Sequence, residues 1–414
     1  MDQLYTAYLN NLRNPFIKVC RLRFLNPDGS VAFALDNNYR QERNKTFISD
    51  GSITVNLQNG TRRTASVTLS NVTAEYDYAY NKMWFGQEIA IDEGMLLPDG
   101  SEYYIQQGIF LISNPDEVVN PSERMAQYSL VDKWANLDGS LGGNLEGTYE
   151  VAVGTNIFAP IVALLQEDIG NGRPLDNITP VITEYYNSMT QTLPDGTTVS
   201  IVDTPYTLTV NGGSTKADVV TGLTGMLNAW VGYDASGALR IDPSQDDISD
   251  ADKPIAWTFS HDETTLLGTT YSVKNTDVYN DYIIVGEQLD DYSQPSARAQ
   301  NLDPASDTNI NLIGRKTKWE TASGFSTDTQ CKDLAVWKLK RAAVLQKAVS
   351  ISASQILHIR ENELVEIIRT DKEGSPVERH LIQGFQRPLV GTGRMTINAV
   401  SVMDFPNITA TTGS

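Results

Sequence analysis

Hydrophobic and polar residues alternate along residues 16–138, and residues 251–404 also contain strand-like segments, together with one long helix. A period of two is typical of strands with one buried and one exposed face. In the first stretch, Asp-Gly and Asn-Gly pairs favour tight turns between such strands. This stretch therefore predicts several short strands in a small, closed or nearly closed barrel. The turn pairs are Asp28-Gly29, Asn59-Gly60 and Asp99-Gly100.

Four segments carry apolar residues at helical spacing. A stripe over residues 4–12 predicts a short helix that ends before Asn14-Pro15 and docks on this chain or on a neighbour. Further helices are predicted at residues 156–169, 215–230 and 327–347. The last two begin with capping-box pairs, Thr215 with Asp218 and Thr327 with Gln330.

The two β-rich stretches and the mixed segment between them predict a mainly β protein with an α+β insertion. The insertion, residues 140–250, combines two of the helices with a short strand and a hairpin. Residues 288–311 are polar and rich in turn formers, so we expect a long loop or arm there. Residues 380–405 predict two or three closing strands, and the tail ITATTGS is expected to be frayed.

Charge excludes one class of function. The chain has 414 residues, with 32 Lys and Arg against 51 Asp and Glu, and a net charge of −19. A protein that coats nucleic acid needs a basic face, so this chain is not expected to be one. The charge is also uneven, because residues 234–307 hold 15 acidic and 4 basic residues, whereas residues 315–347 hold 3 acidic and 8 basic ones. Two such surfaces suit a self-assembling ring, although a helix with a solvated basic face explains the second segment equally well.

The sequence contains few features that indicate a cellular compartment. Cys20 and Cys331 lie far apart in the sequence and outside any Cys-x-x-Cys pair, so two reduced core thiols are expected. The first residues lack the basic and apolar regions of a signal peptide. No run of about 18 apolar residues occurs, so no membrane anchoring is expected.

Residues that could carry chemistry are scattered. His261, His358 and His380 lack the spacing of a metal site, and His261-Asp262-Glu263 is not accompanied by a Gly-x-Ser-x-Gly nucleophile elbow. The run from Gly212 to Lys216 lies between a strand and a helix, but its residues are not in the order that a phosphate-binding loop requires.

Two further clusters leave alternatives open. Four aspartates could offer oxygen ligands to a cation, but the glycine and closing glutamate of a calcium loop are missing, so a solvated acidic loop is favoured. A dense set of aromatic residues could form a sugar-binding platform, or belong to a core or interface. No catalytic, metal-binding or cofactor-binding residue is assigned, and no cofactor is expected. The clusters are Asp246, Asp247, Asp250 and Asp252, and Tyr76, Tyr78, Tyr80, Trp84 and Phe85.

Four stretches, taken in order, resemble the tail hub (baseplate hub) proteins of tailed bacteriophages, a family that includes late control protein D and related tail-tip proteins. Each motif is weak alone, but together they cover nearly the whole chain. They run from GTRRTASVTLSNVTAEYD to AQYSLVDKWANLDGSLGG (60–143), from GTNIFAPIVALLQEDIG to the end of GYDASGALRIDP (154–243), from NDYIIVGEQ to DTQCKDLAVWKLKR (280–341), and along HLIQGFQRPLVGTGRMTINAVSV (380–402).

The resemblance implies a structural role without catalysis. Such hubs form a homotrimeric ring whose subunits each carry two tube-like barrels, so that three subunits match the sixfold tail tube. The partners would be a tail tube or distal tail protein, a spike or tip protein and the tape measure protein, and DNA would pass through the channel without specific binding. The protein would belong to the virion and be assembled in the host cytoplasm. We expect the excess acidic residues to line the channel and the basic helix near Lys332–Lys347 to face away from it.

The resemblance also sets the expected domains. These are residues 1–139 for the first barrel with its N-terminal helix, 140–250 for the inserted α/β domain, 251–404 for the second barrel-forming segment with the long helix at 327–347, and 405–414 for a flexible tail. Some relatives continue into further domains, so this chain resembles the bare hub module. The alternatives are a carbohydrate- or receptor-binding β-protein of a phage tail, and an enzyme such as a glycosidase.

Overall fold

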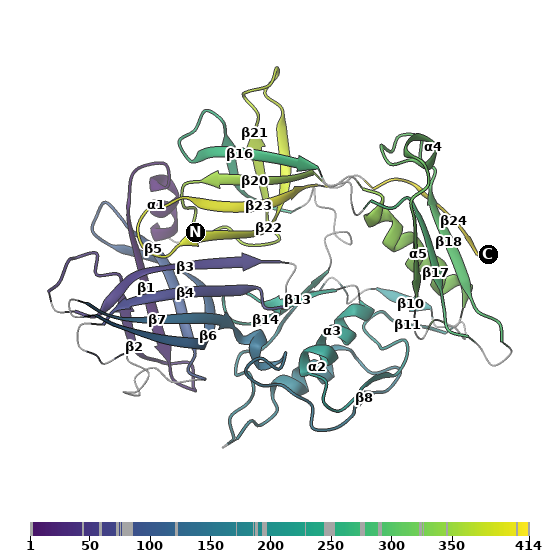
Figure 1. Cartoon of the computed structure of the whole chain (residues 1–414), viewed down its shortest axis with the longest axis horizontal. Coiled ribbons are helices and arrows are strands. Elements are labelled where there is room, and N and C mark those ends of the chain that lie inside the picture. The colour runs from purple at the N-terminus through teal and green to yellow at the C-terminus, as the bar shows by residue number, and fades with distance from the viewer. Residues whose placement is uncertain are drawn as a thin grey trace. The chain divides into compact units, whose positions relative to one another are not determined.

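The computed structural model divides into two compact units (Figure 1). The larger unit comprises Met1–Thr190, Ser200–Thr269 and Ser350–Ala399, and the smaller one comprises Gln191–Val199, Thr270–Val349 and Val400–Ser414. The structure describes residues 3–43, 45–57, 60–71, 74, 76, 86–120, 123–170, 172–184, 186, 189–192, 197–227, 229–243, 253–273, 278–288, 292–322, 325, 327–344, 347–402 and 405–412.

Seven antiparallel strands form the first part of the larger unit, in the order β3-β4-β7-β6-β5-β1-β2. Their hairpin turns follow the sequence signals: Asp28 and Asp99 each accept a hydrogen bond from the backbone N–H of the serine two residues later. Gly29 and Gly100 then adopt positive φ angles of 81° and 85°. The strands are β1 (Ile17–Leu25), β2 (Val31–Asp36), β3 (Phe47–Asn56), β4 (Arg63–Ser70), β5 (Ile89–Leu96), β6 (Glu102–Asn120) and β7 (Glu123–Asp132).

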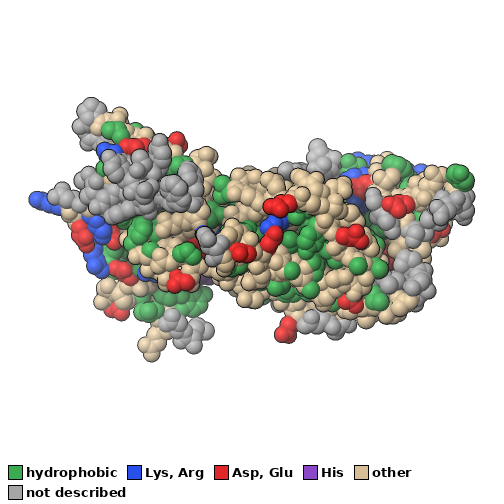
Figure 2. All heavy atoms as spheres, turned by 90° about the horizontal axis from the view of Figure 1, so that it is seen from below, with side chains coloured by type: hydrophobic (Ala, Val, Ile, Leu, Met, Phe, Trp, Pro, Cys, Tyr) green, Lys and Arg blue, Asp and Glu red, His purple; other side chains and the backbone are tan. Residues whose placement is uncertain are grey.

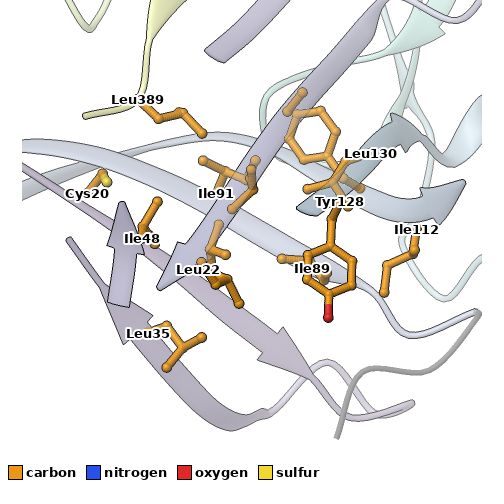
Figure 3. Packing of buried hydrophobic residues seen from close by; sticks show 14 of the residues in the cluster. Cys20, Leu22, Leu35, Ile48, Ile89, Ile91, Ile112, Tyr128, Leu130 and Leu389 are labelled. Atoms are coloured by element: carbon orange, nitrogen blue, oxygen red, sulfur yellow. The ribbon is translucent and has the colours of Figure 1, made fainter. Parts of the chain in front are cut away.

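These strands enclose a single hydrophobic core (Figure 3). The end strands β2 and β3 both contribute to it, through Leu35 and Ile48, although they are not paired along their described residues. The sequence prediction of a closed or nearly closed barrel stays a prediction, since β2 and β3 do not pair along their described residues. Cys20 is a free thiol within this core, as expected. Labelled members in Figure 3 include Leu22, Ile89, Ile91, Ile112, Tyr128, Leu130 and Leu389.

A second group of strands continues the same sheet. β22 pairs with β21 and β23 and, through residues 384–388, with β3, so that one 13-stranded sheet results. The two barrels expected from the sequence are therefore not two separate closed sheets along the described residues, because β22 occupies the edge of β3. The mainly β class is confirmed. The strands are β15 (Ile255–Ser260), β16 (Leu266–Val273), β20 (Lys347–Ala353), β21 (Leu364–Ile368), β22 (Val377–Pro388) and β23 (Met395–Ser401).

The inserted α/β segment has a core of its own, built around α2 (Phe158–Leu165) and α3 (Lys216–Met226). The capping box of Thr215 with Asp218 is present at the start of α3. The other elements are the 3₁₀ helix η2 (Lys133–Asn136), β8 (Tyr149–Val151), β9 (Val181–Ile182), β12 (Leu208–Val210), β13 (Ala229–Tyr233) and β14 (Leu239–Pro243).

Two helix boundaries differ from those predicted. α2 ends at Leu165 rather than residue 169, because the chain folds back and the backbone N–H of Ile169 donates to the carbonyl of Arg173. α3 ends at Met226, and Trp230 belongs to β13, where it pairs with Asp242 of β14. Its helical spacing from Val219 was coincidental.

The N-terminal stripe forms α1 (Gln3–Asn11) and docks on this chain. Tyr8 is fully buried, its hydroxyl accepts from the backbone N–H of Leu357 at 2.9 Å, and it lies 3.1 Å from Nδ1 of His358. No helix among the residues described above is long and apolar enough to cross a membrane.

The smaller unit holds a four-stranded sheet, β19-β17-β18-β24, with α5 (Asp328–Ala342) packed on one face (Figure 1). The predicted capping box of Thr327 with Gln330 starts α5, and Cys331 in its first turn is a buried free thiol packed in the core between α5 and the sheet. The remaining elements are β10 (Thr190–Thr192), β11 (Thr198–Ser200), β17 (Asp281–Val285), β18 (Ser296–Asn301), α4 (Ile310–Ile313), β19 (Thr317–Thr321) and β24 (Ile408–Thr412).

Three predictions are wrong in this unit. The helix ends at Ala342 rather than residue 347, because β20 begins at Lys347. The expected polar loop at 288–311 contains β18, an inner strand whose small residues Ala297 and Ala299 face α5. Residues 408–412 of the expected frayed tail form β24, which pairs with β18.

Candidate functional site

A charged cavity of about 590 Å³ lies within the larger unit. Its wall comes from four places: the start of β4, the N-terminal half of β6, the β13–β14 hairpin and the segment 360–363. Ser236 and Arg240 of the wall are exposed, so the cavity opens to solvent. The wall residues include Arg62, Arg63, Ile105, Gln106, Trp230, Gly232, Asp234, Asp242, Arg360, Glu361 and Glu363.

Arg62 is held against the indole of Trp230. Its guanidinium carbon lies 3.2 Å from the ring centroid, and its Nη2 donates to the carbonyl of Val231. This stacking needs a glycine at position 232, because a Cβ there would lie 2.2 Å from Nε of Arg62. Arg62 is only 3 % exposed. Burial lowers the pKa of Arg62 to about 9.

Arg63, by contrast, is fully paired. Its Nη2 lies 2.5 Å from Oε1 of Glu361, its Nη1 donates to the carbonyl of Gln107 at 2.8 Å, and its Nε donates to the carbonyl of Tyr233. Burial raises the pKa of Glu361, but Arg63 and the hydrogen bonds outweigh it and hold that pKa below its ordinary value. Glu361 is therefore ionised at neutral pH.

Arg360 uses its guanidinium to hold backbone carbonyls. Nη1 donates to Leu357 and Ile359 and to the side-chain oxygen of Gln107, and Nη2 donates to the carbonyl of Gln106. Burial lowers its pKa to about 10. Among the described residues, no carboxylate lies within ion-pair distance of the guanidinium of Arg62 or of Arg360. The cavity wall thus contains two cationic groups without such a partner.

A buried ionic network lies elsewhere in the larger unit. Both oxygens of Glu93 in β5 are used: Nζ of Lys18 lies 2.5 Å from Oε1, and Nε of Arg387 lies 2.5 Å from Oε2. The three side chains are at most 1 % exposed. Lys18 also donates to Gln355 and to the carbonyl of Pro388. This network joins the first seven strands to β22.

The histidines of the sequence are kept apart. His358 contacts Tyr8 and the carbonyl of Ala256, His380 lies in β22 with Nε2 3.6 Å from Glu378, and His261 lies 3.9 Å from Asp371. The described part of the chain contains no group of three or more His, Cys, Asp or Glu side chains that could hold a metal ion.

The other sequence candidates fall outside the cavity. Lys216, at the end of the glycine-containing turn, pairs with Glu167 at 2.6 Å. Tyr76 is 8 % exposed and packs in the first core, which agrees with the core interpretation of the aromatic cluster for this residue. The rest of that cluster (Tyr78, Tyr80, Trp84 and Phe85) and the aspartates 246, 247, 250 and 252 lie outside the described residues.

Sequence reasoning missed the cavity. Arg62 and Trp230 are 168 positions apart, and the apolar spacing predicts a helix rather than a strand at Trp230. The only local signal was the Arg-Arg pair directly before a strand, in TRRTASV. An arginine at a strand start is usually solvated, so the signal was too weak to use.

Lowering the pH is expected to raise the free energy of unfolding through Asp132, the capping residue of η2. The reason is that its buried carboxylate becomes protonated and loses its charge. Its carboxylate is fully buried and accepts from the backbone N–H groups of Arg62, Arg63 and Trp134. Burial nevertheless raises its pKa from the ordinary 3.8 to about 6. Stability from this group is thus fully present below pH 3.8 and is lost as the pH rises through about 6.

The measurement compares the free energy of unfolding of the wild type and Asp132→Asn between pH 4 and pH 7. The wild type should lose stability relative to the variant as the pH rises, because asparagine does not titrate. A difference that stays constant over this range would contradict the assignment.

No protein-family model matches the chain, and no curated protein matches its sequence. Solved structures do match. The tail protein from Neisseria meningitidis MC58 has 9 % identity, a TM-score of 0.58 and coverage of 93 % of this chain and 97 % of its own. The 43 kDa tail protein of prophage MuSo2 from Shewanella oneidensis has 12 % identity, a TM-score of 0.60 and coverage of 92 % and 98 %.

A third match is the prophage tail protein gp18 from Listeria monocytogenes EGD-e, with 6 % identity, a TM-score of 0.51 and coverage of 92 % of this chain and 94 % of its own. The chain therefore has the fold of these tail proteins along nearly its whole length. The resemblance drawn from the sequence motifs is confirmed at the level of the fold.

Proposed function

We propose that this chain is a structural hub of a phage tail, present in the virion, that assembles in the host cytoplasm as a homotrimeric ring. The ring would adapt the sixfold tail tube to a threefold spike or tip and line the channel for the tape measure protein and DNA. The full-length likeness to three tail proteins carries this proposal. The chain would act as an adaptor rather than a catalyst.

Exposed apolar side chains support a role in assembly. Figure 2 shows hydrophobic side chains gathered in the middle of one face, over the part that carries α2 and α3, with acidic side chains scattered among them. Such exposure is typical of surfaces that contact other proteins. Exposed apolar residues in this part of the chain are Leu141, Val153, Val162, Ile169 and Val181.

The domain division and the channel lining remain part of the proposal. We propose a first domain at residues 1–139, an inserted domain at 140–250 and a second β domain at 251–404. The excess acidic residues would line the channel, since an acidic wall repels DNA at short range. A neutral or basic lining in an image of the assembled tail end would contradict this part alone.

Trimerisation is tested directly by the molar mass in solution. Light scattering over a concentration series should give three times the chain mass of 45.6 kDa. A chain that stays monomeric at high concentration, and binds neither tube nor spike proteins, would refute the hub proposal.

Reversing two charges on α5 is expected to weaken the trimer. The basic segment 315–347 would meet an acidic surface of a neighbouring subunit. The double variant Lys332→Glu with Lys340→Glu should then raise the concentration at which the trimer dissociates at least tenfold. The effect should be larger at low salt. Lys340 is exposed and Lys332 half-buried.

The matched control is Arg43→Glu with Lys372→Glu, which changes the net charge equally at exposed sites of the larger unit rather than on α5. This control variant should associate like the wild type. Equal weakening in both double variants would mean that only overall repulsion, and not a specific contact of α5, is involved.

A further inference from the structure

A short chain of hydrogen bonds joins α1 to the rest of the larger unit. The backbone N–H of Leu357 donates to the hydroxyl oxygen of Tyr8 over 2.9 Å, and that hydroxyl lies 3.1 Å from Nδ1 of His358. On the other side of the ring, Nε2 lies 3.1 Å from the carbonyl oxygen of Ala256. A carbonyl can only accept, so Nε2 carries the ring proton and Nδ1 accepts from Tyr8. All three hydrogen bonds are therefore satisfied only when His358 is neutral.

Aromatic side chains surround the ring of His358. Tyr5, Tyr8 and Trp257 present their rings edge-on to it, at centroid distances of 6.2, 5.7 and 5.8 Å. Two of these three side chains belong to α1, and the Tyr8 side chain is fully buried. The docked helix therefore shields this side of the imidazole from water, which disfavours its charged form.

The charges near His358 also oppose its protonation. Arg360 of the same segment and Arg387 of β22 act on the ring, and both are cationic. The helix α1 and the strand β15 contain no charged residue. Among the described residues, no carboxylate lies at ion-pair distance from His358, whereas His261 and His380 each have one. Burial, followed by the two arginines, holds the pKa of His358 below its ordinary value of 6.5.

We propose that Tyr8 and His358 form an acid-sensitive latch, which holds α1 on the larger unit and loosens when Nδ1 of His358 is protonated. A protonated Nδ1 is a donor, so it and the N–H of Leu357 both direct a proton at the Tyr8 oxygen, and the hydroxyl proton loses its acceptor. A buried donor without an acceptor costs free energy. Lifting α1 exposes both groups to water and relieves this cost. The proposal is independent of the trimeric hub, since the latch belongs to a single chain.

The latch should open as the pH falls. In the opened state His358 is solvated and its pKa returns to the ordinary 6.5, whereas in the docked state its pKa is lower. The docked state therefore has its full stability above pH 6.5 and loses it as the pH falls below that value. Because α1 has only nine residues, it is too short to stay helical in water once it has lifted. Its backbone amides should then exchange with solvent.

Hydrogen exchange of the full chain, followed by mass spectrometry at pH 7 and pH 5, measures this opening. After correction for the intrinsic pH dependence of exchange, the peptide that carries α1 should exchange roughly threefold faster or more at pH 5 than at pH 7. Peptides from β4, whose side chains pack in the core of the first seven strands, provide the internal reference and should keep their protection.

His358→Asn keeps an acceptor near the place of Nδ1 but does not titrate, so its α1 should exchange equally at both pH values. Tyr8→Phe provides a second variant in case the first does not fold: without the hydroxyl, α1 should exchange faster at pH 7 and respond less to acid. The matched control is His261→Asn, a histidine that lies 3.9 Å from Asp371 and outside the latch, and it should behave like the wild type. The proposal is overturned if the exchange of α1 does not change with pH, if β4 loses protection to the same extent, or if the folded latch variants respond to pH like the wild type.

Discussion

Replacing Glu93 by glutamine is expected to destabilise the larger unit by about 3–5 kcal/mol, the cost of breaking a buried ion pair. Glu93 is shared by Lys18 and Arg387, and all three side chains are almost fully removed from solvent. Without the carboxylate, two cations remain buried with no anion beside them. Burial raises the pKa of Glu93, but Arg387 and Lys18 outweigh it and hold that pKa below its ordinary value.

Asp92, the preceding residue, provides a matched control. It also binds two arginines, Arg21 at 2.6 Å and Arg23 at 2.7 Å. Their side chains are 37 % and 23 % exposed, so water can solvate them when the carboxylate is gone. Asp92 itself is only 2 % exposed, so Asp92→Asn should cost more than the loss of a surface pair but less than Glu93→Gln.

Chemical denaturation followed by β-sheet circular dichroism measures both variants. The pH dependence provides a second readout, because a lowered carboxyl pKa gives stability that is lost as the pH falls through the folded-state pKa. That acid-side loss should be smaller in Glu93→Gln than in the wild type. Equal destabilisation by Glu93→Gln and Asp92→Asn would contradict the argument that the cost depends on how deeply the partner cations are buried.

Replacing Leu389 by alanine is expected to cost about 2–5 kcal/mol, as for other buried leucines. Leu389 follows β22 yet is fully buried in the core of the first seven strands (Figure 3). Its backbone N–H also donates to the carbonyl of Gly51 at 2.9 Å. The substitution leaves a cavity where the two groups of strands meet.

The control for this variant is Leu267→Ala in β16, whose side chain is 51 % exposed. That change should alter the free energy of unfolding by less than about 0.5 kcal/mol. Hydrogen exchange can locate the effect: in Leu389→Ala, amides of β3 and β22 should exchange faster together. Loss of protection in β22 alone would show that the two groups fold independently.

Local signals in the sequence predicted much of the fold. The capping boxes at Thr215 and Thr327 and the Asp-Gly turns were read correctly, because these features depend on residues only two or three positions apart. Helix ends were less predictable. Trp230 follows α3 at helical spacing, but pairing with β14 makes it part of a strand.

Features set by distant partners were not predicted. β18 looked like a loop because its buried positions are the small residues Ala297 and Ala299, and only the packing of α5 shows why they are small. The cavity depends on the contact of Arg62 with Trp230, and no local pattern brings these two residues together. The candidate site was therefore less predictable than the fold around it.

The pairing of β3 with β22 has a consequence for synthesis of the chain. Asn56 pairs with Gly384, so the ribosome must add roughly 330 residues before β3 acquires this neighbour. At typical translation speeds this takes about 15–65 s. During that interval β3 is an unpaired edge of the nascent sheet, which is a site for aggregation. High-level expression at reduced temperature, or with chaperones that shield nascent strands, should therefore raise the soluble yield of this protein.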